Sequence, residues 1–182
     1  MTSPHLDRFW LLTWTTYGTR LPGDRRGFVS DTRDGAGDFV IHNIPGTPVD
    51  ADEPELERAA RERMRGSPIY LSEDQALATI TALRAQAEFR KHRLFAAAVM
   101  ANHVHLVVGV VGDPEPEWLL GDFKAYASRA LNLRWPKPRN GTWWTRSGSK
   151  QKLPDEPAVI AAVRYVESQD RPLTLWIDPR FE

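Results

Sequence analysis

The sequence predicts an α+β fold: a ferredoxin-like split β-α-β antiparallel sheet with an extra C-terminal helix and a long insertion after the first strand. Two observations lead to it. The residue patterns follow the order strand, insertion, helix, strand, strand, helix, strand, helix, which contains the β-α-β-β-α-β series of that fold. The length of 182 residues fits one domain spanning 1–182.

The first half of the chain contains the first strand, the insertion and one helix. Residues 8–17 are rich in aromatic and β-branched side chains, which favours a strand. Turn signals and weak periodicity from about 18 to 70 predict an irregular insertion, with a charged helical turn at 55–65. Ser72 is a good N-cap for a helix that runs to about residue 92.

The second half predicts a hairpin, two helices and a short strand between them. Residues 94–100 and 103–109 are apolar on both faces, which is typical of central strands. A helix over 115–134 ends at two prolines, and residues 143–145 form a short strand. Asp155 can cap a last helix that reaches about residue 169.

Composition excludes several classes of protein. The chain has no cysteine, so a disulfide framework, a thiolate zinc site and a cysteine nucleophile are ruled out. The longest apolar stretch, 95–111, is interrupted by Asn102, His103 and His105, and no signal peptide is visible at the N-terminus. We therefore expect a cytoplasmic protein with no membrane partner.

The charge is balanced overall but unevenly distributed. There are 24 basic and 24 acidic residues, and a net charge of zero by itself counts against a nucleic-acid partner. Acidic residues concentrate at 50–62, whereas residues 123–152 carry eight bases and no acid. A solvated charged surface and a surface that binds a polyanion both fit this segment.

Two places in the chain have the residue types of a catalytic centre. His103 and His105 alternate along a strand, so both point to one face, about 6.5 to 7 Å apart, where they could share a metal ion or be ordinary core histidines. Tyr165 and Gln169 lie one helical turn apart, on a different face from the apolar stripe. By itself this tyrosine could equally be a side chain that packs at an interface.

Together, the two patterns resemble the single-tyrosine HUH transposases of insertion sequences and their REP-associated relatives. The similar strings are Val-Met-Ala-Asn-His-Val-His-Leu-Val-Val at 99–108, Trp-Trp-Thr-Arg-Ser-Gly-Ser at 143–149 and Ala-Ala-Val-Arg-Tyr-Val-Glu-Ser-Gln at 161–169. Thr-Trp-Thr-Thr-Tyr-Gly-Thr-Arg-Leu-Pro-Gly at 13–23 is similar to one branch of the family. The resemblance covers about 8–112 and 117–172, without the insertion.

The resemblance implies a metal-dependent single-stranded DNA transesterase, acting in DNA transposition or REP-type hairpin processing. Its catalytic residues would be Tyr165, His103 and His105, and one divalent ion, Mg or Mn, would be held by His103, His105 and Gln169. Tyr165 would form a covalent 5′-phosphotyrosine. The implied partner is single-stranded, hairpin-forming DNA in a nucleoid-associated setting, with a homodimer as one form of the protein.

The basic segment then becomes the expected nucleic-acid contact. Its cations would bind phosphates, and two tryptophans could stack on unpaired bases, although core packing suits at least one of them. The predicted contacts are Lys124, Arg129, Arg134, Lys137, Arg139, Trp143, Trp144, Arg146, Lys150 and Lys152.

Two other functions remain open from the sequence. One is a catalytically inactive, domesticated nucleic-acid-binding module with the same ferredoxin-like sheet. The other is a metal-dependent phosphohydrolase that uses water in place of tyrosine. The intact Tyr-x-x-x-Gln sequence at 165–169 favours the transesterase over both.

Overall fold

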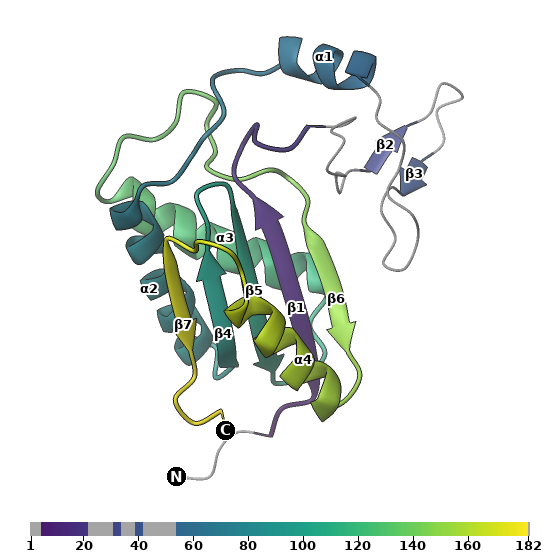
Figure 1. The fold of residues 1–182 in the computed structure, drawn as a ribbon, viewed down its shortest axis with the longest axis vertical. Helices are drawn as coiled ribbons and strands as arrows, with labels where there is room; N and C mark the ends of the chain where they lie inside the picture. The colour runs from purple at the N-terminus through teal and green to yellow at the C-terminus, as the bar shows by residue number, and fades with distance from the viewer. Residues whose placement is uncertain (1–4, 22–30, 34–38, 42–53, 182) are drawn as a thin grey trace.

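The fold is built on one antiparallel sheet of five strands (Figure 1). A computed structural model describes residues 5–21, 31–33, 39–41 and 54–181. The strands lie in the order β6 (Ser149–Leu153), β1 (Arg8–Thr15), β5 (His103–Val110), β4 (Arg93–Val99) and β7 (Thr174–Ile177). The first four of these have the order of the split β-α-β fold, which confirms the predicted fold class.

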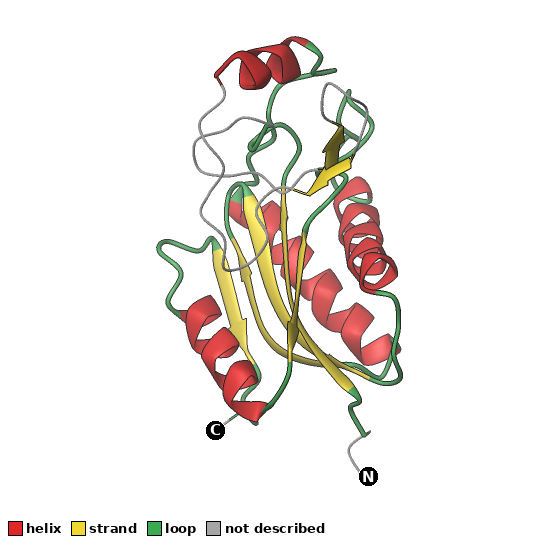
Figure 2. Ribbon diagram, turned by 90° about the vertical axis from the view of Figure 1, so that its right-hand side faces the viewer, coloured by secondary structure: helices red, strands yellow, loops and turns green. Residues whose placement is uncertain are grey.

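Helices cover both faces of the sheet, as the edge-on view in Figure 2 shows. Helices α2 (Glu73–Phe89) and α3 (Pro116–Asn132) pack on one face, and α4 (Glu156–Glu167) packs on the other. The side chains of β1 point alternately to the two faces of the sheet. Leu12 and Trp14 pack in the core under α2 and α3, whereas Phe9 and Leu11 pack on the α4 side. The face that a strand residue occupies therefore decides which helix it meets.

The helix boundaries follow local capping signals. The hydroxyl of Ser72 accepts from the backbone N–H of Gln75, whose side chain accepts from the backbone of Ser72 in return. The carboxylate of Asp155 accepts from the backbone N–H of Ala158 and so begins α4. Both predicted N-caps are confirmed.

Two strand predictions differ from the structure. Residues 143–145 form no strand. Trp143 and Trp144 are buried, and Trp144 makes only an isolated bridge to Thr16. The strand that pairs with β1 comes later, as β6. Just before β6, Gly148 passes so close to the Thr13 carbonyl oxygen that a Cβ added to it would lie 2.7 Å from that oxygen. The sheet also gains β7 at its far edge, which the sequence analysis missed because this short strand follows a proline without clear alternation.

The described part of the insertion contains one helix, none of whose residues is buried. Helix α1 (Pro54–Glu62) confirms the predicted charged turn, and β2 (Asp31–Arg33) pairs with β3 (Phe39–Ile41). Tyr17 ties the end of this segment to the sheet, since its hydroxyl accepts from the backbone N–H of Arg65 at 2.8 Å. Residues 22–30, 34–38 and 42–53 of the predicted insertion lie outside the described residues. Of the helices in the described part of the chain, none is long and apolar enough to cross a bilayer.

Candidate active site

The structure brings His103, His105 and Tyr165 together on one face of the sheet. Both histidines project from β5 toward the α4 side, and their ring centroids are 4.8 Å apart at an interplanar angle of 85°. The ring of Tyr165, on α4, meets the ring of His105 edge to face with centroids 5.3 Å apart. Residues more than 60 positions apart in the chain therefore form one cluster.

The packing of α4 explains why Tyr165 faces outward. Val159, Val163 and Val166 are buried against the sheet, so the helix has one fixed orientation. Tyr165 lies beside this stripe with 48 % of its surface exposed, within reach of a large substrate. One turn later Gln169 donates from Nε2 to the Tyr165 carbonyl at 3.0 Å and also hydrogen-bonds to His105.

Two further residues orient the histidines, and the sequence analysis did not identify them. Thr13 Oγ1 lies 2.8 Å from His105 Nδ1, and Asn102 Oδ1 lies 2.7 Å from His103 Nδ1. With Nδ1 engaged in each ring, Nε2 is left for a metal ion or another polar partner. The role of Asn102 could have been suspected from the sequence, because this residue directly precedes His103. Thr13 could be found only from the register, in which it faces His105 across β1 and β5.

Burial keeps both imidazoles neutral at physiological pH. It lowers the pKa of His103 to about 4, with a smaller effect from the nearby charge of Arg20. Burial also lowers the pKa of His105 to about 4, helped by His103 and Arg20 and opposed by the hydrogen bond to Gln169. A neutral imidazole has a lone pair for a metal, which an imidazolium lacks.

The donor set fits one divalent cation. It consists of two neutral imidazoles that are oriented through Nδ1 and the amide side chain of Gln169. Within the described residues no three His, Cys, Asp or Glu side chains cluster closely enough to hold a metal. A metal bound at this site would therefore take its third protein ligand from an uncharged group such as Gln169.

The same pKa shifts predict how stability depends on pH. In the unfolded chain each histidine titrates near 6.5, whereas in the folded protein the pKa values are about 4. Below pH 6.5 the unfolded state binds more protons than the folded state. The free energy of unfolding is therefore highest above pH 6.5 and decreases as the pH falls toward 4. We expect metal-free protein to lose on the order of 2 kcal/mol per histidine over this range.

Urea unfolding at a series of pH values checks this expectation. The matched variant is His103→Ala/His105→Ala, which retains His92, another histidine whose pKa is lowered chiefly by burial. Its free energy of unfolding should fall less steeply between pH 6.5 and 4.5 than that of the wild type. Equal slopes for both proteins would contradict the prediction.

Three of the ten predicted nucleic-acid contacts are wrong, because their side chains are buried. Trp143 and Trp144 are 5 % and 3 % exposed, and their indole N–H groups donate to Asn132 and to the Lys124 carbonyl, respectively. Lys124 is 8 % exposed, and its ammonium donates to the carbonyls of Thr145, Arg146 and Ser147. Burial lowers its pKa to about 8. The Lys124 ammonium therefore fixes the chain segment that precedes β6 and is not available to contact a phosphate.

The remaining basic residues do not form one surface. Lys150 pairs with Glu117 of α3 at 2.8 Å, on the sheet face opposite the histidines, and Lys152 alternates onto that same face. Arg129 belongs to α3, and Arg134 follows it closely in the chain. Arg146 is exposed, in the segment before β6. The remaining predicted contacts, Lys137 and Arg139, are exposed.

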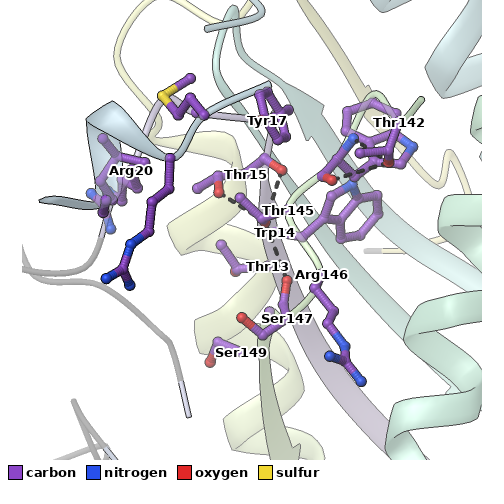
Figure 3. Close-up of a pocket in the computed structure, with 17 residues that line it drawn as sticks. Thr13, Trp14, Thr15, Tyr17, Arg20, Thr142, Thr145, Arg146, Ser147 and Ser149 are labelled. Atoms are coloured by element: carbon purple, nitrogen blue, oxygen red, sulfur yellow. Dashed lines mark hydrogen bonds between the residues drawn. The ribbon is translucent and has the colours of Figure 1, made fainter. Parts of the chain in front are cut away.

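A cavity of about 440 Å³ adjoins the histidine cluster at the end of β1 (Figure 3). Thr13, which contacts His105, is one of its lining residues. The other walls come from the start of β6, the segment before it and the end of α1. Sequence reasoning gave no sign of this cavity, because its walls are distant from one another in the chain.

Comparison with known proteins agrees with this geometry. The family described as "Transposase IS200 like" matches residues 69–169, which include both histidines, Tyr165 and Gln169. No curated protein matches the chain.

Two solved structures are among those similar to this chain. One is described as a REP-associated tyrosine transposase bound to a REP hairpin, at 10 % identity and a TM-score of 0.45, covering 91 % of this chain and 69 % of that one. The other, described as a "putative transposase" of Deinococcus radiodurans R1, has 16 % identity and a TM-score of 0.41, with 93 % and 96 % covered. The family match spans more than half of the sequence. The chain therefore belongs to the IS200-like transposase family.

Proposed function

We propose that this transposase is a metal-dependent single-stranded DNA transesterase with Tyr165 as its nucleophile. The single observation that carries the proposal is the position of Tyr165. Its half-exposed ring packs on His105, and its backbone carbonyl accepts from Gln169. The phenol therefore lies beside the side chains best suited to hold a cation against a phosphate.

The proposed reaction is an exchange of phosphodiester bonds. The Tyr165 Oη attacks phosphorus and loses its proton, while the bond from phosphorus to the 3′-oxygen breaks and that oxygen takes up a proton. The products are a 5′-phosphotyrosine and a free 3′-hydroxyl. Since the number of phosphodiester bonds is unchanged, the reverse attack by a 3′-hydroxyl can rejoin DNA without ATP.

His103, His105 and Gln169 would hold one Mg or Mn ion. When bound, the ion would polarise the scissile phosphate and stabilise the charge that develops on it. The protein prepares the site by keeping both imidazoles neutral and by fixing their rings through Asn102 and Thr13. The half-exposed Tyr165 leaves the open side of the cluster accessible to a DNA strand.

A covalent adduct tests the proposal. The protein is incubated with single-stranded DNA that folds into a hairpin with unpaired flanks, in the presence of Mn²⁺, and is then run on a denaturing gel. A REP hairpin is the first probe, because the similar transposase structure described above contains one. A band of protein linked to DNA supports the transesterase, and its absence across metals and hairpins contradicts it.

The same assay separates the two alternatives. A domesticated binding module would retain salt-sensitive DNA binding and give no nicked product with any metal. A phosphohydrolase that uses water would nick DNA without a covalent adduct and would survive the loss of Tyr165. Nothing in the described site favours either alternative, since the tyrosine, both histidines and the glutamine are adjacent.

Thr13→Val should weaken metal binding without unfolding the protein. The substitution retains the shape of the side chain and removes the contact with His105 Nδ1. Loss of a group that orients a ligand typically costs about 10- to 100-fold in metal affinity. Calorimetric titration with Mn²⁺ measures the change. Thr15→Val is the control, because Thr15 is on the same strand as Thr13 but its hydroxyl hydrogen-bonds to Thr145. Equal affinities for both variants would refute this role of Thr13.

A further inference from the structure

The cavity at the end of β1 lies next to the proposed reaction centre, because Thr13 both lines it and contacts His105. Ser149, Thr13 and His105 lie in register on β6, β1 and β5. Paired residues share a sheet face, and neighbouring strands are about 4.8 Å apart. Thr13 and Ser149 line the cavity (Figure 3). Because both residues are in register with His105, this part of the cavity lies about one strand away from His105. A DNA strand with a phosphate at His105 would pass this part of the cavity.

The chemistry of the cavity wall suits a nucleotide. Among the described lining residues are three arginines and no carboxylate, a composition that suits a phosphate. The hydroxyl-bearing residues Thr13 and Ser149 line the cavity together with the apolar side chain of Met64. The volume of about 440 Å³ lies in the lower range for small-ligand pockets. This combination suits one flat base with its phosphates and leaves no room for a duplex.

Part of the wall comes from the insertion. Ala60, Arg63 and Met64, at the end of α1 and just beyond it, close one side of the cavity. Contacts with Tyr17, just after β1, hold this segment in place. The Tyr17 hydroxyl accepts from Arg65 N–H at 2.8 Å, and the Tyr17 carbonyl accepts from Ile69 N–H at 2.9 Å. The insertion, which the sequence analysis left without a role, thus completes a cavity beside the active site.

We propose that this cavity binds one unpaired nucleotide of the DNA strand, next to the phosphate that Tyr165 attacks. The base packs against Ala60 and Met64, and the exposed Arg63 neutralises an adjoining phosphate. Binding here fixes the register of the strand on the histidines and makes the helix of the insertion a determinant of where DNA is cut. The proposal rests on the transesterase function and adds the site that positions its substrate.

The test measures binding without chemistry. Protein carrying Tyr165→Phe is titrated, in EDTA, onto a fluorescent DNA hairpin with single-stranded flanks of thymidine, adenosine or cytidine, and a single abasic residue is moved stepwise along each flank. Fluorescence anisotropy gives the affinity at each step. We expect one abasic position to weaken binding about tenfold, as loss of a well-packed base does.

Two substitutions on α1 form a matched pair. Ala60→Trp fills the cavity, whereas Ala59→Trp places the same side chain one residue earlier, outside the lining. The Ala59→Trp protein should retain the sensitive abasic position, and the Ala60→Trp protein should bind intact and abasic DNA equally. Arg63→Ala, just after α1, should weaken binding more than Arg58→Ala, which removes the same charge from α1 outside the lining. Circular dichroism confirms that each variant is folded.

The results separate this inference from the proposed function. If Ala60→Trp and Ala59→Trp give the same abasic profile, or if no abasic position matters, the nucleotide site is wrong, whether or not the Tyr165 protein forms an adduct. If the profile depends on Ala60 while the Tyr165 protein forms no adduct with any metal, the nucleotide site stands and the transesterase fails.

Discussion

Tyr165→Phe is expected to abolish the covalent protein–DNA adduct and to reduce nicking by at least about 1000-fold, the scale on which loss of a nucleophile is felt. The substitution removes only the hydroxyl and retains the ring, which packs edge to face on His105. DNA affinity should therefore change by less than about twofold, because the group that is lost acts in the reaction more than in binding. Denaturing gels measure the adduct, and anisotropy measures binding.

Tyr126→Phe is the matched control for this experiment. Tyr126 lies on α3, across the sheet from the histidines, with the Arg129 guanidinium 4.9 Å from the centre of its ring. Its hydroxyl should be irrelevant to the adduct. An adduct of wild-type yield from Tyr165→Phe protein would show that another group attacks phosphorus. Loss of the adduct in Tyr126→Phe alone would transfer the assignment to α3.

The double substitution His103→Ala/His105→Ala is expected to remove metal-stimulated nicking, with a loss of about 100-fold or more in rate. Both rings project from one strand into one cluster, and both are neutral at pH 7 because burial lowers their pKa values to about 4. Calorimetry should show no Mn²⁺ binding to the variant. Its DNA affinity in EDTA should stay near that of the wild type.

His92→Ala is the control for a general effect of removing an imidazole. His92 is half-buried, and burial lowers its pKa as well, yet it lies just before β4 and makes no contact with Tyr165 that the structure describes. Nicking by this variant should equal that of the wild type. If the double variant instead nicks normally in Mn²⁺, then the two histidines do not hold the metal, and Tyr165 would need another source of activation.

Local patterns explain how much could be predicted. Ser72 and Asp155 mark their helices because a cap satisfies backbone groups within one turn. The spacing of Tyr165 and Gln169 predicted one helix face. Gln169 lies two residues past the end of α4, but its side chain still reaches the Tyr165 carbonyl. These interactions join residues at most four positions apart, so they can be read from the chain itself.

Errors occurred where the environment of a side chain depended on distant residues. Trp143 and Trp144 have the composition of a strand or of a stacking surface, but α3 and β1 enclose them. Lys124 belongs to a basic run, yet three carbonyls of another segment surround its ammonium. Charge and aromaticity are properties of the sequence, whereas exposure is decided by packing.

The sequence alone determined the fold class, the helix starts and the four residues of the proposed centre, because periodicity, capping and motif spacing are local. Only the tertiary structure decided that Thr13 contacts His105, that Lys124 is buried while Lys150 pairs with Glu117, and that α1 closes a cavity next to the histidines. Strand register and layer packing create these contacts between residues far apart in the chain. These contacts therefore cannot be read from the spacing of residues along the sequence.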